Sequence, residues 1–512
     1  MLVTFAVLIL LIVSLVLVAL HGWKEDFRFT NLLAGGAAIL AWLLLFFSYS
    51  QLPIKFTLHQ WGLENFFPDP PAFLIDRTSW AFAISQVGFG GAVAISNQKH
   101  IRLLPVWTLG LTAAGVLVSF SANTITLLYS WTLIDVLVFL CLLQGTNNRM
   151  QLEQIVNSFA VRLVGLVFIV GAGFTAYQQG VPLTFDAIPP SVNIYLILAA
   201  VLRLGIWLPS GSLEHIQGFE TILRVIPAAT SLTLIARIAK VGLPAHLRPI
   251  FLYFLIVAAL LAGFTWALAS VKKNPLQIWI WGMGALSVGV AVFGYPSASL
   301  AWGIAALLLG SLPFLASDWS MPMSILGALC FIGSTALPFT PTWAGVKIYS
   351  IGGWGVLFGV AHGLLAGGYL RIVLERHKTR SKHGSWEILP SVSGIAILPI
   401  TQIMVSLFLG ELSMSSALEM RWLWGSLIAL SVVAGVMVWN HFSVSIPESF
   451  TKGISAFGSI PRLIRQALMY FFNFLHRFFY ILTEVFEGEG GVMWTLLGAL
   501  LVVSILASMR GG

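Results

Sequence analysis

The sequence predicts an all-α membrane protein that crosses the bilayer about sixteen times. Of its 512 residues, 58% are hydrophobic and 9% are charged, and the mean hydropathy is +0.92, whereas soluble proteins carry roughly 25% charged residues. Apolar stretches of the ~20 residues that a transmembrane helix needs recur along the whole chain. The two cysteines, Cys141 and Cys330, stand alone inside such stretches, so no disulfide framework or metal–sulfur site is expected.

The expected helices follow one another with short connections. In the first half we place them at 2–20, 31–49, 76–96, 104–121, 124–143, 158–178, 192–209 and 222–240. In the second half we place them at 248–270, 277–294, 299–315, 323–341, 350–371, 389–409, 421–439 and 491–508. The first helix lacks a basic start and a small-residue cleavage site, so we interpret it as a retained span and not as a signal peptide.

Lysines and arginines test this count, because they accumulate in the cytoplasmic loops of membrane proteins. With sixteen helices, one side holds sixteen such loop residues, including Lys24, Lys272 and the cluster at 371–382, and the other side holds seven. This asymmetry predicts that both termini are extracytoplasmic, and we expect an integral protein of a bacterial cytoplasmic membrane. Topology therefore explains the net charge of +8, and we expect a lipid bilayer and no nucleic acid as partner.

The stretch between the last two predicted spans has a different character. It sets the basic residues Arg462, Arg465, His476 and Arg477 among leucines and phenylalanines, and it ends at the glycines after Glu487. The pattern predicts a basic amphipathic helix of about seven turns. Such a helix lies either on the cytoplasmic surface of the bilayer or along partner subunits, and the sequence leaves both open.

Charged residues within apolar surroundings single out the stretch 193–240. Arg203, Arg224 and Arg237 lie in its two apolar segments, and the polar link between the segments contains Glu214. Pro209 and Gly211 break helix in this link, and glutamates and a histidine accompany them. Charge within hydrocarbon at broken helices is typical of ion pathways. The alternative is two ordinary spans whose arginines extend to the membrane interface.

Five stretches carry motifs whose order and spacing extend over most of the chain. They are FLIDRTSWAFAISQVG (73–88), SFAVRLVGLVFIVG (158–171), VIPAATSLTLIARI (225–238), SVKKNPLQ (270–277) and LGALCFIGSTALPFTPTWAGVKIYS (326–350). They are similar to helix motifs of the antiporter-like subunits of respiratory complex I, membrane-bound hydrogenases and multisubunit cation/proton antiporters. The matching residues are Asp76, Ser79, Arg162, Val164, Gly165, Pro338, Pro341, Gly345 and Lys347.

The resemblance implies an architecture, and the distal complex I subunit is the most similar member. It implies two inverted five-helix repeats with broken helices and a lateral helix before the last span. The first two helices and an extracytoplasmic loop then occupy 1–75. The two antiporter-like halves occupy 76–240 and 241–388. The C-terminal helices follow at 389–447, the lateral helix at 448–490 and the last helix at 491–512. It also implies other membrane subunits as partners and no bound cofactor, metal or catalytic residue in this chain.

The residues to which the family's proton transport is attributed are altered here. The family's central pair is a glutamate after a tryptophan on the fifth helix and a lysine on the seventh. In this chain Thr132 follows Trp131 in place of the glutamate, and Asp135 comes three residues later, on what we expect to be the same helix face. Arg203 lies near the expected lysine. We hypothesise that Asp135 and Arg203 rebuild the pair, although arginine, unlike lysine, does not release its proton.

Other relay positions are lost. Leu166 replaces the sixth-helix acid and Pro227 the eighth-helix histidine, while Ala306 and Gly310 occupy the places of an eleventh-helix histidine and lysine. His362 is read as a hydrogen-bonded core histidine or as a substitute in the relay. The full set of candidates for a proton path is Asp135, Arg203, Thr132, Glu214, Lys272, Lys347 and His362, and the candidates for buried charge are Arg162, Arg224 and Arg237.

Three functional hypotheses follow from these residues and the resemblance. The first is a proton-translocating membrane-arm subunit of a complex I-like NADH/quinone oxidoreductase, with reduced conduction and with the redox chemistry in other subunits. The second is a subunit of a cation/proton antiporter or of an inorganic-carbon transport complex. The third is a scaffold that holds its neighbours by helix packing alone.

Overall fold

The structure is a computed structural model that describes most of the chain. The described residues are 1–23, 29–58, 70–96, 103–144, 149–206, 219–268, 276–315, 319–378, 385–410, 423–442 and Arg477. The chain divides into two compact units, Met1–Val444 and Ser445–Gly512. The predicted lateral helix at 448–490, apart from Arg477, and the predicted last span at 491–508 lie outside the described residues.

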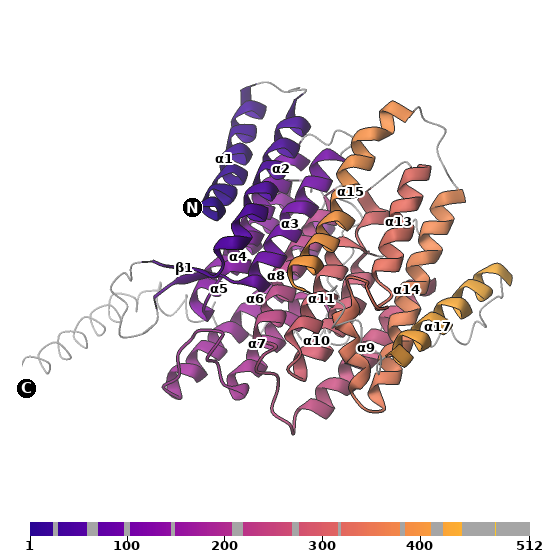
Figure 1. The fold of residues 1–512 in the computed structure, drawn as a ribbon. Coiled ribbons are helices and arrows are strands. Elements are labelled where there is room, and N and C mark those ends of the chain that lie inside the picture. The colour runs from indigo at the N-terminus through magenta and orange to yellow at the C-terminus, as the bar shows by residue number, and fades with distance from the viewer. Residues whose placement is uncertain are drawn as a thin grey trace, which may run out of the picture. The chain divides into compact units, whose positions relative to one another are not determined.

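The first unit consists almost entirely of helices, which confirms the predicted all-α fold class (Figure 1). Its first half contains α1 (Leu2–Trp23), α2 (Thr30–Ser48), α3 (Arg77–Ile95), α4 (Leu104–Phe120), α5 (Thr124–Gln144), α6 (Arg149–Gln178), α7 (Pro190–Arg203) and α8 (Glu220–Ile238). Its second half contains α9 (Arg248–Leu268), α10 (Leu276–Val292), α11 (Pro296–Leu308), α12 (Leu312–Leu315), α13 (Met321–Gly333), α14 (Trp354–Lys378), α15 (Ser385–Phe408) and α17 (Leu423–Phe442). Short 3₁₀ helices lie at Tyr49–Gln51 (η1) and Trp343–Ser350 (η3).

The length and composition of these helices fit a protein that crosses a membrane many times. Among the described residues, eleven helical segments are long and apolar enough to span a bilayer, and α4, α7, α10 and α13 are apolar but shorter. Every predicted span from 2–20 to 421–439 coincides with one of the helices, and the span at 299–315 coincides with two, α11 and α12.

Two predicted helices of the second half are interrupted where the sequence removes a backbone bond or turns the chain. The span at 299–315 breaks after Leu308, where Pro313 lacks the N–H that would continue the helical ladder. The span at 323–341 ends at Gly333, and Ala336 and Phe339 then adopt left-handed φ angles of 51° and 63°. The chain continues through η3 into α14, so a broken helix precedes Trp354.

The seventh helix is shorter than predicted, and this is a correction. α7 ends at Arg203, six residues before the predicted end at Pro209, because Gly205 turns the chain with a φ of 74°. The helix therefore breaks before the proline and glycine to which the sequence assigned the break. Arg203 becomes a helix-terminal residue, and residues 207–218 with Glu214 lie outside the described residues.

A short antiparallel ribbon, which the sequence did not predict, joins the second and third helices. Strand β1 (Ile54–Thr57) pairs with β2 (Ala72–Ile75), with Ile54 opposite Ile75. Directly after β2, the Asp76 carboxylate accepts from the Ser79 backbone N–H at 2.7 Å, and the Ser79 hydroxyl accepts from the Asp76 N–H at 2.8 Å. This capping box fixes the start of α3. The Asp76 and Ser79 motif therefore has a structural role.

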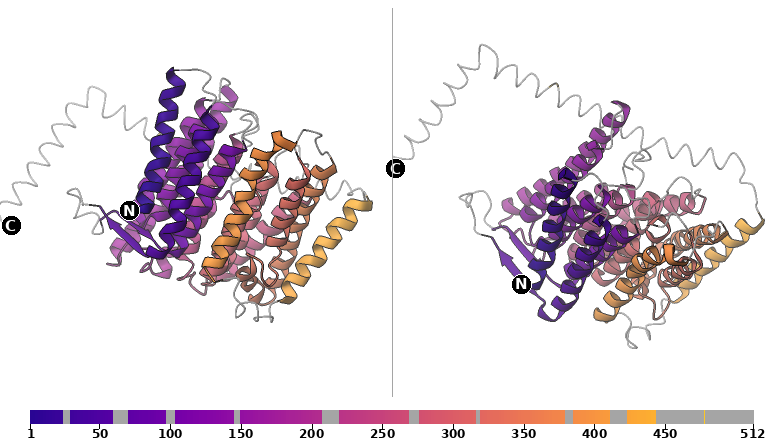
Figure 2. Two further views of the ribbon diagram at one scale, coloured as in Figure 1. Left: turned by 45° about the horizontal axis from the view of Figure 1, so that its top comes forward. Right: turned by 90° about the horizontal axis from the view of Figure 1, so that it is seen from above.

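The helices differ in how deeply they are buried. α3 and α8 are enclosed on nearly all sides, and α8 packs against α3, α4, α7, α10 and α11. α1 and α6 expose much of their apolar surface, as expected of helices that face lipid or another subunit. In both views of Figure 2 the neighbouring helices α1 and α2 run side by side. The enclosed α8 brings its two arginines into the interior of the first half.

Candidate functional site

A single carboxylate, Asp135, lies midway along α5. Eleven residues separate it from the start of the helix at Thr124, which corresponds to about 17 Å of helix. A hydrocarbon core is ~30 Å thick, so this depth is near its middle. The residue is 1% exposed. A charge at this depth requires a partner, and two arginines supply it.

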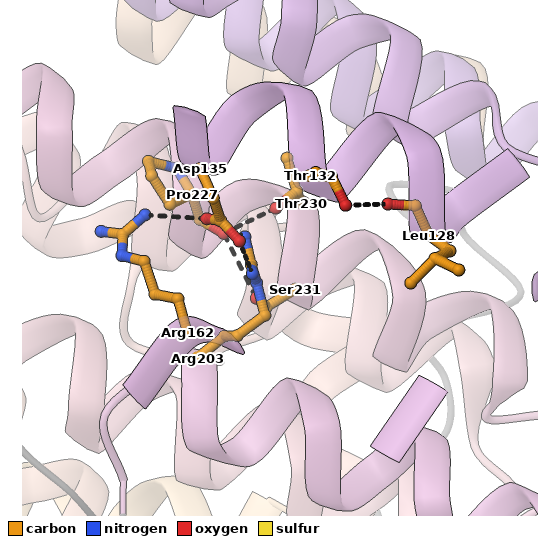
Figure 3. A network of polar contacts seen from close by, with 8 residues as sticks. All are labelled: Leu128, Thr132, Asp135, Arg162, Arg203, Pro227, Thr230 and Ser231. Carbon is orange, nitrogen blue, oxygen red and sulfur yellow. Dashed lines mark hydrogen bonds and ion pairs between the residues drawn. The ribbon is translucent and has the colours of Figure 1, made fainter. Parts of the chain in front are cut away.

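Arg203 and Arg162 both bond to the Asp135 carboxylate (Figure 3). Nη1 of Arg203 lies 2.5 Å from Oδ2 and its Nη2 lies 2.8 Å from Oδ1, so the pair is bidentate. Nη1 of Arg162 on α6 lies 3.3 Å from Oδ1. The Arg203 guanidinium also lies over the Trp131 ring, 4.2 Å from its centroid. Side chains from α5, α6 and α7 thus hold one negative and two positive charges together.

Gly165 on α6 allows the Arg203 side chain to reach Asp135. A Cβ atom at Gly165 would lie 3.2 Å from Cγ of Arg203, which is tighter than most real Cβ contacts. The end of α7 at Arg203 places the guanidinium beside this glycine. The motif residues Arg162 and Gly165 therefore both serve the Asp135 site, one by bonding and one by its lack of a side chain. The sequence alone did not connect them with Asp135.

A small cavity adjoins the Asp135 site. It is lined by Leu142, Ser158, Arg162, Arg203, Leu204, Leu223, Arg224, Pro227, Ala228, Gln277 and Ile280, and it has room for a group of the size of water. Pro227 interrupts the α8 ladder beside the cavity, and the Thr230 and Ser231 hydroxyls both donate to its carbonyl, at 2.7 and 3.2 Å. These contacts appear in Figure 3 behind Asp135.

Arg224, on the same helix, is held within the protein. Its guanidinium pairs with Glu220 at 2.7 Å and donates to Oε1 of Gln277 at 3.0 Å. Nε2 of Gln277 in turn donates to the Leu204 carbonyl at 3.3 Å. The alternative of an arginine extended to the interface is wrong for Arg224, whose side chain is 7% exposed.

Arg237 is also buried, 7% exposed, so the interface alternative is wrong for it too. Its guanidinium donates to the Ser121 carbonyl and, at 3.4 Å, to the Ser119 carbonyl. It also lies 5.5 Å from the centroid of the Phe185 ring. Both serines lie at the C-terminal end of α4, where carbonyls lack helical partners. Arg237 therefore caps α4 at its turn into α5.

Thr132 does not share the environment of Asp135, and this corrects the expected common face. Its side chain is exposed on the outer surface of α5, and its hydroxyl donates to the Leu128 carbonyl at 2.8 Å (Figure 3). Residues three apart lie about 60° from one another around the helix axis, so the boundary between the buried and the exposed face of α5 passes between the two side chains. Two further candidates, Glu214 and Lys272, lie outside the described residues.

The second half contains packed aromatic side chains at the positions of the missing relay. Nε1 of Trp279 donates to the Ala306 carbonyl at 3.0 Å. A Cβ atom at Gly310 would overlap the Trp279 indole. Trp266 and Tyr369 lie against the same indole, with ring centroids 5.4 and 5.6 Å away. This region of the described structure is closed by packing.

His362 on α14 is a hydrogen-bonded core residue. Nε2 lies 2.7 Å from the Ser334 carbonyl, which only accepts, so Nε2 carries the proton. Nδ1 then accepts from the Tyr349 hydroxyl at 2.8 Å. His362 thereby ties α14 to the broken segment at 334–350. Lys347 lies on η3 in that segment, half-buried, and no acidic side chain of the described residues pairs with it.

The described residues hold no cluster of three or more histidine, cysteine, aspartate or glutamate side chains that could bind a metal ion.

No protein-family model matches the sequence, and no curated protein does. Solved structures, by contrast, match the fold over most of the chain.

Three of these structures are membrane complexes. A chain of the Mrp complex from Dietzia sp. DQ12-45-1b has a TM-score of 0.69 at 13% identity over 99% of this chain, which spans 63% of that chain's length. A chain of the membrane-bound sulfane sulfur reductase, an archaeal respiratory complex, has a TM-score of 0.66 at 11% identity over 98% of this chain and 99% of its own. A chain of respiratory complex I from Thermus thermophilus has a TM-score of 0.60 at 14% identity over 80% of this chain and 99% of its own. The chain therefore shares its fold with chains of these membrane complexes, as the resemblance of its motifs led us to expect.

Proposed function

We propose that the chain is an ion-translocating membrane subunit of a multisubunit complex and that protons pass through its first half at Asp135. The observation that supports this most directly is the carboxylate of Asp135, which is buried midway along a spanning helix and held by Arg203 and Arg162. Acids at this depth are costly and generally belong to ion pathways. Other membrane subunits and the lipid bilayer are the proposed partners.

In this proposal Asp135 is the group that binds and releases the proton. Arginine keeps its proton under all ordinary conditions, so Arg203 and Arg162 act through charge alone. A proton delivered through water in the adjoining cavity binds to the carboxylate only when a guanidinium moves away from it. Trp131 offers Arg203 a second favourable contact through its ring face, so the guanidinium retains a partner during this movement. Return of Arg203 then expels the proton.

The second half takes no part in this path. Trp279 fills the space beside Gly310, and both ring nitrogens of His362 are engaged in structural hydrogen bonds. The chain accordingly provides one proton route, through its first half, and no second route through its second half. Glu214 remains a candidate for the entrance or exit of this route, whereas Lys272 and Lys347 belong to the second half and are not assigned to it.

Two kinds of complex accommodate such a subunit. The first is a redox-driven complex of the complex I type in a bacterial cytoplasmic membrane, in which quinone-site and iron–sulfur subunits drive proton movement here. The second is a cation/proton antiporter or an inorganic-carbon transport complex. In either case we propose that both termini are extracytoplasmic, as the loop charges predict.

The test is purification of the intact complex in mild detergent, followed by proton transport in liposomes. Co-purified iron–sulfur and quinone-site subunits support the redox-driven complex, and a soluble zinc protein or small membrane subunits alone support the second kind. In liposomes, Asp135→Asn is expected to abolish proton movement. Unchanged proton movement in an assembled Asp135→Asn complex would overturn the proposal and leave a scaffold.

A further inference from the structure

The cavity beside Asp135 is lined by hydrogen-bond donors. Its polar side chains are those of Arg162, Arg203, Arg224, Gln277 and Ser158, and no carboxylate lines it among the described residues. The remaining lining residues are apolar or contribute backbone. Two of the three guanidinium groups share the carboxylate of Asp135, so a net positive charge lies beside this small space, and the surrounding protein and lipid screen it poorly.

Two of these arginines share one carboxylate. Asp135 serves both Arg162 and Arg203, so two positive charges face one negative charge in this group. Among the described contacts, one hydrogen bond, to Asp135, engages the Arg162 guanidinium, which has five N–H donors. Nε of Arg203 is buried without a hydrogen-bond acceptor in the described structure. The Arg162 side chain is 17% exposed and that of Arg203 is 1% exposed, and an excess positive charge in such mostly buried surroundings is unfavourable unless an anion accompanies it.

We propose that this cavity binds a small monovalent inorganic anion of the chloride class. The cavity has room for a group of the size of water, which fits a monatomic ion and excludes phosphate or a carboxylic metabolite. Arg162 and Arg203 supply unused donors, and Gln277 is fixed by bonds at both ends of its amide, to Arg224 and to the Leu204 carbonyl. The site is therefore preorganised for a negative ion.

Binding of the anion is linked to protonation of Asp135, and only this linkage rests on the proposed function. An anion in the cavity gives Arg162 and Arg203 a second negative partner, so they leave the carboxylate more easily and Asp135 accepts a proton more easily. By reciprocity, a neutral Asp135 strengthens anion binding by the same factor. Proton uptake is then faster in chloride than in a large anion that the cavity excludes.

The test is equilibrium binding of radioactive chloride to the purified complex that contains the full chain, washed beforehand into gluconate. We expect saturable binding of one ion per chain that bromide displaces. Ser158→Asp places a tethered carboxylate in the cavity and is expected to weaken this binding at least tenfold. In Ser158→Asn the new side chain has nearly the size of aspartate but no charge, and this variant is expected to bind chloride as the unaltered chain does. This pair assigns the site without removing an arginine, and it separates the cavity from chloride sites on other subunits.

Several outcomes would overturn the anion site. They are absence of saturable binding in the unaltered chain, equal binding by the Ser158→Asp and Ser158→Asn variants, and binding that appears only after Glu214→Gln. The last result would mean that the chain's own glutamate fills the cavity. Asp135→Asn separates this proposal from the proposed function. Chloride binding that persists or tightens while transport continues supports the anion site and rejects Asp135 as the proton carrier.

Discussion

Both oxygens of Asp135 face the two terminal nitrogens of Arg203, with Oδ2 2.5 Å from Nη1 and Oδ1 2.8 Å from Nη2. Such a fork pairing is stronger and more directional than a single contact. It joins α5 to the last residue of α7, and Arg162 adds a link to α6. One carboxylate thus connects three helices, and its loss affects both the packing of the first half and its charge.

We first predict that Asp135→Asn destabilises the assembled complex. Removal of one partner from a buried ion pair typically costs about 3–5 kcal/mol, because the remaining charge is left without compensation. Here two guanidinium groups lose their partner. The measurement is the temperature at which the detergent-purified complex dissociates, and the expected change is a clear decrease.

The double variant Asp135→Asn with Arg203→Gln is the matched control for this prediction. It removes the pair together but leaves Arg162 without its carboxylate, so part of the lost stability should return, whereas proton transport should not. The difference between the double variant and the two single variants gives the coupling between the residues. Additive effects of the two single variants would contradict the prediction, since partners in direct contact are expected to couple.

The sequence predicted the fold class and the helix positions because long apolar stretches leave few alternatives within a bilayer. It also brought Asp135 and Arg203 into one hypothesis, by their places on the fifth and seventh helices. It misplaced the end of α7, since the turn at Gly205 is stronger than the local signal at Pro209. Glycine in a span is common, and only the surrounding structure decides whether it turns the chain.

Other features depend on contacts across long sequence separations, which a single sequence does not reveal. Thr132 and Asp135 are neighbours on α5, but the rotation of the helix in the bundle buries Asp135 and leaves Thr132 exposed. The capping role of Arg237 depends on carbonyls more than a hundred residues away. The overlap of Trp279 with the space at Gly310 likewise arises only when α10 packs against the segment between α11 and α12.

A second prediction concerns the identity of the basic residue. Arg203→Lys keeps the positive charge but loses the fork geometry, so one hydrogen bond to Asp135 replaces two. We expect proton transport to persist at a lower rate, because lysine supplies the charge but holds Asp135 less firmly than the fork does. The measurement is the rate of proton movement in liposomes. An identical rate for both chains would mean that the fork geometry at this position does not control transport.

A third prediction concerns Arg237, which we place outside the proton path. Arg237→Gln leaves the Ser119 and Ser121 carbonyls without their guanidinium donor, and unsatisfied buried groups cost about 1–3 kcal/mol each. The dissociation temperature of the complex should decrease, while transport per assembled complex stays unchanged. Arg248→Gln is the control, because this arginine donates to one carbonyl, that of Leu243, and is only partly buried. Loss of transport at unchanged stability would instead place Arg237 on the path.

A fourth prediction tests the closed second half. Gly310→Ala introduces a methyl group where the Trp279 indole lies, and overpacking of this kind typically costs about 1–3 kcal/mol. Trp279→Phe provides a smaller ring, so the double variant should recover part of the lost stability. Because the second half carries no protons in our proposal, transport per assembled complex should be the same in all three variants. If the double variant recovers stability but transports more slowly than the unaltered chain, the Trp279 hydrogen bond to Ala306 belongs to a conducting path and the single-route proposal is wrong.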